Sequence, residues 1–178
     1  MIKPPDTLET DRLLLRLPLM HDADAIFEAY AQDEEVTKFL IWRPHQNVIT
    51  TRKFVHRCIR SWNEATAFPW VIVSKKDNRL IGMLELRIDG FRADLGYAIT
   101  REFWGNGYAT EATKSVIKWS LAQDTIYRVW ATCDIENLAS ARVLEKAGMQ
   151  REGILRRSII HPNISDEPRD CICFSVVK

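Results

Sequence analysis

Residues 101–112 read Arg101-Glu102-Phe103-Trp104-Gly105-Asn106-Gly107-Tyr108-Ala109-Thr110-Glu111-Ala112. They join a strand-like run, residues 93–100, to a helix-like run that continues to about residue 122. Glycines at such a junction let backbone N–H groups converge on one point, and the N-terminus of the helix adds partial positive charge there. The stretch therefore predicts a site for phosphate groups.

The segments around this stretch indicate a mixed sheet. Strand-like runs cover residues 70–74, 80–88 and 93–99, and short polar turns separate them, so they predict an antiparallel meander. A further strand, residues 129–133, follows the helix that begins after Gly107. A strand–helix–strand crossover of this kind favours parallel pairing of its two strands.

The remaining segments complete one α+β domain over residues 1–178. We expect a mostly antiparallel sheet of six to seven strands with one parallel pair, flanked by about four helices. The other expected elements are a strand at 13–17, a helix at 22–30 capped by Asp22, a helix from Thr50, a helix at 137–146 closed by Gly148, and strands at 151–158 and 170–177.

The composition excludes several broad classes of protein. With 178 residues, of which 46% are hydrophobic and 28% charged, the chain has ordinary globular values. A net charge of +1 supports neither nucleic acid nor membrane as a partner. Because no apolar run is long enough to span a membrane and the N-terminus does not resemble a signal peptide, we expect a cytoplasmic protein. Residues 36–63 carry six Lys or Arg and no acid, which indicates a solvated helix face or, alternatively, a surface for an acidic partner.

The four cysteines do not indicate a metal site, because their positions show no paired ligand spacing. We expect no metal and interpret all four as reduced structural thiols. They are Cys58, Cys133, Cys171 and Cys173.

Two familiar phosphate-binding loops fit the glycines poorly. A Walker A loop ends in Gly-Lys-Ser/Thr, whereas Gly107 is followed by Tyr108. A dinucleotide fingerprint needs a third Gly or Ala where this chain has Thr110, and it follows the first strand of a parallel sheet rather than a meander. A plain turn that starts a helix is the remaining structural alternative.

A larger pattern identifies the loop. Residues 104–109 resemble the acetyl-CoA loop of the GNAT acetyltransferases, whose general form is Gln/Arg-x-x-Gly-x-Gly/Ala. Gly107 and Ala109 match this form, and Trp104 stands in place of the usual Gln or Arg. The wider string 104–112 is typical of the RimJ/RimL-like branch, which acetylates protein N-terminal amines and often carries Trp or Tyr at this position.

A second match lies downstream, in the order and spacing of the family. Residues 137–149 resemble the segment Asn-x-x-Ser-x-x-Leu-Glu-Lys-x-Gly-Phe. Residues 95–97, Leu-Gly-Tyr, and residues 11–16 near the N-terminus are also similar to the family. The resemblance thus covers almost the whole chain and implies the GNAT fold.

The resemblance implies a direct transfer, in which an amine attacks the thioester of acetyl-CoA without an acyl-enzyme intermediate. Backbone N–H groups of residues 105–109 would hold the pyrophosphate. The strand end at Ala98 and Ile99 would pair with the pantetheine arm, and an N–H there could polarise the thioester carbonyl. The expected cofactor contacts are Ala98, Ile99, Trp104, Gly105, Asn106, Gly107, Tyr108, Ala109, Thr110, Asn137 and Ser140.

Ser140 is the expected proton donor to the leaving thiolate. Many relatives use a Tyr on this helix, but the corresponding position here is Leu144, and the RimL-like branch is thought to use the serine. Ser140 could instead bond its own helix backbone. Asn137 could cap the helix, contact the cofactor, or do both.

The general base is expected to be Asp94 or Glu85, acting through water, with an exposed strand carboxylate as the alternative for each. Glu111 is explained by the helix dipole. Trp42 could line an acceptor pocket or pack in the core. We expect His45 and His161, both in loops, to be non-catalytic.

Three functions are compatible with these residues. The first is acetylation of a protein N-terminal α-amine, and the second is acetylation of a small-molecule amine such as an antibiotic or polyamine. The third is a GNAT fold that binds CoA without turnover. Monomer and homodimer are equally compatible with the sequence.

Overall fold

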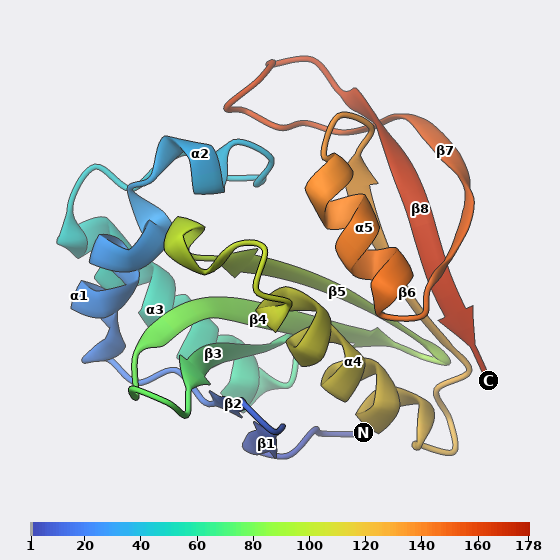
Figure 1. Ribbon diagram of the computed structural model, residues 1–178, viewed down its shortest axis with the longest axis horizontal. Helices are drawn as coiled ribbons and strands as arrows, with labels where there is room; N and C mark the ends of the chain where they lie inside the picture. Colours follow the sequence, from blue (N-terminus) through green and yellow to red (C-terminus); the bar gives the residue numbers. More distant parts are fainter. Residues whose placement is uncertain (1) are drawn as a thin grey trace.

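A computed structural model describes residues 2–178, which form one mixed sheet flanked by helices (Figure 1). The sheet has eight strands in the order β1-β2-β3-β4-β5-β6-β8-β7, one strand more than the upper expectation. The addition is β1, whose three residues are too short to show periodicity. The strands are β1 Thr7–Glu9, β2 Leu13–Arg16, β3 Phe68–Ser74, β4 Leu80–Asp89, β5 Arg92–Ile99, β6 Arg128–Asp134, β7 Gln150–Ile159 and β8 Arg169–Val177.

Five α-helices lie within the described residues, again close to the expected number. A π-helical turn, Phe27–Ala31, continues the first helix, and a 3₁₀ turn, Arg101–Phe103, follows β5. The α-helices are α1 Asp22–Ile26, α2 Glu34–Thr37, α3 Val48–Glu64, α4 Tyr108–Leu121 and α5 Leu138–Lys146.

Two helix starts differ from the sequence-based prediction. Asp22 does not cap α1, because its carboxylate pairs with Arg16 at 2.7 Å and accepts the N–H of Leu19 at 2.7 Å. The helix α3 begins two residues before Thr50, because Asn47 caps it by accepting the Thr50 N–H at 3.1 Å. Both differences come from polar side chains that have more than one available partner.

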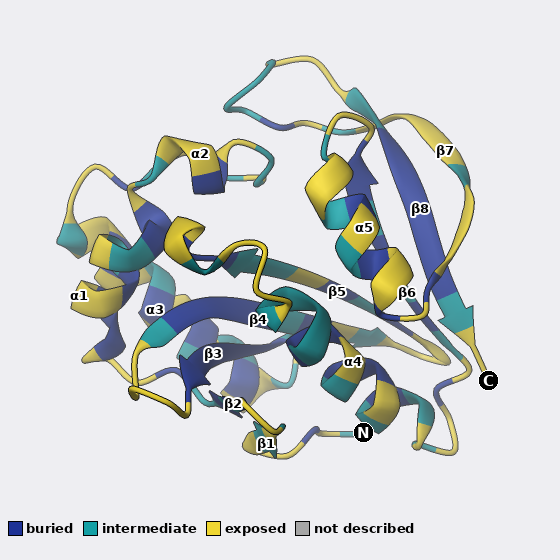
Figure 2. Cartoon of the chain, in the orientation of Figure 1, coloured by how far each residue is buried: buried dark blue, intermediate teal, exposed yellow. Residues whose placement is uncertain are grey.

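Helices bury both faces of the sheet. Consecutive residues of β3 point to opposite faces: Trp70 belongs to the core cluster that includes residues of α4 and α5, while Val71 belongs to the cluster that includes residues of α1 and α3. Val116 of α4 and Val55 of α3 are fully buried on these two faces. This double burial explains why β3 is an unbroken apolar run, and Figure 2 shows β7 as the exposed edge.

The parallel pair expected from the crossover is present, and it is short. β5 pairs with β6 only where Arg92, Ala93 and Asp94 lie opposite residues 128–130. Beyond this point the two strands run apart, as Figure 1 shows, while β5 stays paired with β4 up to Ile99. The sheet therefore opens into a V between β5 and β6, and α5 follows β6 along one arm.

The four cysteines are free and buried. Nowhere in residues 2–178 do three or more His, Cys, Asp or Glu side chains gather in a way that could hold a metal ion. Over the same residues, no helix combines the length and apolar character needed to cross a membrane.

Candidate active site

The glycine loop turns directly into α4. Gly105 and Gly107 have φ angles of 77° and 80°, in the left-handed region where a side chain is strained. Gly107 occupies the N-cap position of α4, and no side chain caps the helix there. The first N–H groups of α4 therefore lack a side-chain acceptor and can bind an anion.

Trp104 fastens this loop to the open end of β5. Its indole Nε1 donates to the carbonyl oxygen of Ile99 at 2.7 Å, and the side-chain amide of Asn106 donates to the Trp104 carbonyl at 3.1 Å. The residue that replaces the family's usual Gln or Arg thus holds the loop against the arm of the V.

Arg12 and Glu111 fix the other side of the loop. Glu111 accepts hydrogen bonds from the Thr10 hydroxyl at 2.5 Å and from Arg12 Nε at 2.6 Å. Arg12 also donates to the Asn106 carbonyl at 3.0 Å and lies over the ring of Tyr108. Burial raises the pKa of Glu111, but the bonds from Thr10 and Arg12 outweigh it and the net shift is downward. Glu111 is therefore a loop anchor in addition to being placed well for the helix dipole.

The open edge of β5 presents the backbone of Tyr97 and Ile99. Thr100 donates its N–H to the Ile81 carbonyl of β4, so by strand alternation the backbone groups of Ala98 also face β4. A Cβ on Gly82 of β4 would lie 2.3 Å from the Ala98 carbonyl oxygen, which confirms that direction. Of the two residues predicted to contact the pantetheine arm, Ile99 has its N–H at the open edge and its carbonyl bonded to Trp104, whereas the backbone groups of Ala98 face β4.

The first turn of α5 brings Ser140 to the V. Asn137 caps this helix, accepting the Ser140 N–H at 3.1 Å. The Ser140 hydroxyl lies 2.9 Å from the Tyr97 hydroxyl, so it points across the V and not back at its own helix. Leu144 is 1% exposed and belongs to the core. From the sequence, Tyr97 could be recognised only as part of the Leu-Gly-Tyr triplet. Its contact with Ser140 could not be predicted, because the two residues are 43 positions apart in the chain.

The two candidate bases lie on the opposite face of β4 and β5 from Tyr97. Arg87 holds both of them, with Nη1 at 2.6 Å from Glu85 and Nε at 2.8 Å from Asp94. Glu85 lies opposite Gly96, where an added Cβ would meet no atom within 4 Å. Glu85 therefore borders open space, while Asp94 is engaged by a second nitrogen of Arg87.

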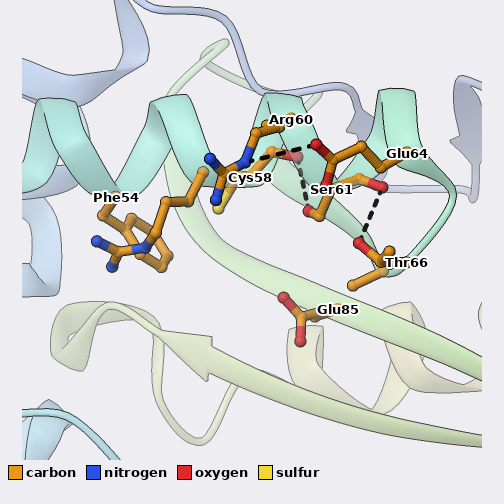
Figure 3. A pocket seen from close by; sticks show the side chains of 9 residues that line it. Phe54, Cys58, Arg60, Ser61, Glu64, Thr66 and Glu85 are labelled. Carbon is orange, nitrogen blue, oxygen red and sulfur yellow. Dashed lines mark hydrogen bonds and ion pairs between the residues drawn. The ribbon is translucent and has the colours of Figure 1, made fainter.

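A cleft of about 230 Å³ separates α3 from this part of the sheet. Figure 3 shows Glu85 reaching from β4 toward the side chains of α3, which include Phe54, Cys58 and Ser61. Trp42 packs against Phe54, with ring centroids 6.0 Å apart, at the edge of the core. Trp42 therefore packs at the core edge against a residue that lines the cleft, and it is not itself among the lining residues.

The two loop histidines have structural partners. His45 Nδ1 lies 2.9 Å from the Thr51 hydroxyl, and burial lowers the pKa of His45. His161 is buried with Nε2 at 3.8 Å from Asp134, and burial is the largest cause of its lowered pKa. Neither ring lies among the residues that line the cleft beside Glu85.

Comparisons of the sequence and of the fold with known proteins all find acetyltransferases. The family description "Acetyltransferase (GNAT) domain" matches residues 12–150. The chain is 32% identical to the uncharacterized N-acetyltransferase YoaA of Bacillus subtilis (strain 168), over 96% of each chain. It is 26% identical to the [Ribosomal protein uS5]-alanine N-acetyltransferase of Escherichia coli (strain K12), covering 84% of this chain and 81% of that one. The crystal structure of the microcin C7 self-immunity acetyltransferase MccE, in complex with acetyl-CoA and AMP, superposes with a TM-score of 0.88 at 22% identity, over 98% of each chain.

Proposed function

The chain belongs to the GNAT family of N-acetyltransferases, and we propose that it transfers the acetyl group of acetyl-CoA to the N-terminal α-amine of a protein. The observation that carries the transfer chemistry is the V between β5 and β6, with the uncapped start of α4 at one side and Ser140 on the other. The relative that acetylates the alanine of a ribosomal protein supports the choice of acceptor.

In this proposal the cofactor binds on the side of α4 and α5. The N–H groups at the start of α4 hold the pyrophosphate, because the helix dipole and the left-handed glycines leave them directed at an anion. The pantetheine arm extends beside Tyr97 and Ile99, whose backbone groups face the V. The thioester then lies near the Ser140 hydroxyl.

The acceptor amine approaches from the α3 side, through the cleft that Glu85 lines. Gly96 leaves space beside Glu85 for a chain that reaches toward the V. An ammonium group must lose a proton before it can attack the thioester, and Glu85 takes this proton through a water molecule. Ser140 gives a proton to the sulfur as the carbon–sulfur bond breaks.

The acceptor is tested by thiol release from acetyl-CoA with two sets of amines. We expect tetrapeptides with a free N-terminal Ala or Ser to react with kcat/KM about 10-fold or more above spermidine and kanamycin, because Arg57 and Arg60 line the cleft beside its two glutamates and offer a polycation no net attraction. Mass spectrometry should place the acetyl group on the α-amine. Each test peptide contains an internal Lys, and the matched control is the same peptide with a blocked N-terminus. The control should stay unmodified. Preferential acetylation of the small amines, or of the Lys, would assign the enzyme to another acceptor class.

The choice between the two carboxylates is tested by the pair Glu85→Gln and Asp94→Asn. We expect Glu85→Gln to lower kcat/KM about 100-fold near neutral pH, within the usual range for general base catalysis, with partial recovery at high pH as the free amine becomes abundant. Asp94→Asn should change kcat/KM less than about 5-fold, since two nitrogens of Arg87 hold Asp94 whereas only one holds Glu85, which also lines the cleft. The reverse order of effects would make Asp94 the base.

A further inference from the structure

The hydrogen bond between Tyr97 and Ser140 joins the two arms of the V. Tyr97 belongs to β5 and Ser140 to the first turn of α5, and their hydroxyl oxygens are 2.9 Å apart. The Tyr97 hydroxyl also lies 3.4 Å from the Ser140 carbonyl oxygen. Among the described residues, the backbone of β5 pairs with β6 only up to Asp94, so this side-chain contact lies beyond the paired part of the two strands. The phenol therefore contacts the proposed proton donor, beside which the proposed function places the thioester.

A serine alone is a weak donor to a thiolate. An aliphatic hydroxyl holds its proton much more tightly than a thiol does, so Ser140 can release its proton only if another group replaces it at once. A phenol is ordinarily a stronger acid than an aliphatic hydroxyl, with a pKa of about 10. Burial raises the pKa of Tyr97 above that value, with the Ser140 hydrogen bond opposing it, so the phenol carries its proton near neutral pH and gives it up only as Ser140 loses its own.

Leu144 of α5 brings no second donor to this place. Its side chain is 1% exposed, lies in the core and has no hydroxyl. Tyr97 brings a phenol to the same helix from the facing strand. The two hydroxyls together can do what one phenol on α5 would do.

We propose that Tyr97 supplies, through Ser140, the proton that the leaving CoA thiolate receives. As the carbon–sulfur bond breaks, its electron pair stays on sulfur, and the Ser140 Oγ–H proton moves to that sulfur. The Tyr97 Oη–H proton moves to Ser140 Oγ at the same time. Tyr97 is left as a phenolate and regains a proton from solvent, which balances the proton that the amine lost to solvent through the general base. Tyr97 is thus a positioning and relay residue, and this role rests on Ser140 as the donor in the proposed function.

A double-mutant cycle tests the relay, with glycinamide and an Ala-initiated tetrapeptide as alternative acceptors. Tyr97→Phe is expected to lower kcat about 10- to 100-fold and to change the KM for acetyl-CoA less than about 2-fold. In a Ser140→Ala background the same change should lower kcat less than about 2-fold, because the two hydroxyls act as one unit. The control is Tyr127→Phe, an exposed tyrosine at the closed end of the V, which should keep wild-type kcat.

Two outcomes would overturn the relay. One is a Tyr97→Phe loss of the same size with and without Ser140, which would mean that the phenol acts independently. The other is a change confined to KM or to the affinity for CoA, which would mean a packing role. If the enzyme acetylated glycinamide but not the peptide, the proposed acceptor would be wrong and the relay could still be tested. The reason is that the same CoA thiol leaves in both reactions.

Discussion

Gly107→Val is expected to abolish CoA binding in isothermal titration calorimetry. Gly107 has φ +80°, where a residue with a Cβ costs about 1–2 kcal/mol and a β-branched residue costs more. Gly107 is also the N-cap of α4. If the backbone of residue 107 relaxes to a negative φ, the N–H groups at the start of α4 no longer point to the proposed pyrophosphate site. An added side chain would in addition occupy the point at which the phosphate must approach the backbone. Both effects act on the cofactor and leave the core untouched.

The Gly107 result is interpretable only if the protein stays folded. Circular dichroism should show the wild-type spectrum and a melting temperature lowered by only a few degrees, since the loop is exposed. Gly90→Val is the matched control, because Gly90 has φ +58° in the distant β4–β5 turn. Arg12→Ala should give an intermediate result, about 10-fold weaker binding, because it removes the bond to the Asn106 carbonyl and leaves the backbone angles unchanged. Unchanged CoA affinity in Gly107→Val would exclude the loop as the phosphate site.

Ser140→Ala is expected to lower kcat about 10²- to 10⁴-fold, the range of general acid–base catalysis, while CoA still binds within about 3-fold. The α5 helix should be unaffected, because the cap bond from Asn137 uses the backbone N–H of residue 140, which alanine retains. Alanine also has a favourable helix propensity. The loss should therefore appear in turnover and not in cofactor affinity.

Ser115→Ala is the control for this substitution. Ser115 lies on α4, and its hydroxyl donates to the Ala112 carbonyl at 2.8 Å, within its own helix. Its removal should leave kcat unchanged. If Ser140→Ala kept wild-type turnover, or lost CoA binding in proportion to kcat, Ser140 would be a structural or cofactor-binding residue and the proton would have to come from elsewhere.

The larger elements of the fold could be predicted because their signals are local. The apolar run of β3, the turns of the meander and the glycines before α4 each determine backbone conformation within a few residues. The parallel pairing of β5 with β6 followed from the crossover rule, which depends on element order alone. By contrast, β1 was missed because three residues carry no usable period.

The details of the site could be predicted only in part. Ser140 and the loop residues were identified from motifs, and their roles in catalysis and cofactor binding remain predictions. Arg12 and Tyr97 were not identified as site residues, because each acts on a partner tens of residues away. For Asp22 the local rule was wrong. The sequence predicted that it caps α1, but in the fold its carboxylate pairs with Arg16 instead.

The sequence by itself determined the family, the order of the larger elements and the glycine loop before α4, because glycine conformation, apolar periodicity and motif spacing act along the chain. Only the tertiary structure decided which groups meet across the V. Strand alternation turned Ala98 toward β4 and Tyr97 toward Ser140, and the register of β4 with β5 set Glu85 beside the space left by Gly96. Hydrogen bonds across a sheet depend on three-dimensional position, and that position exists only once the strands have paired.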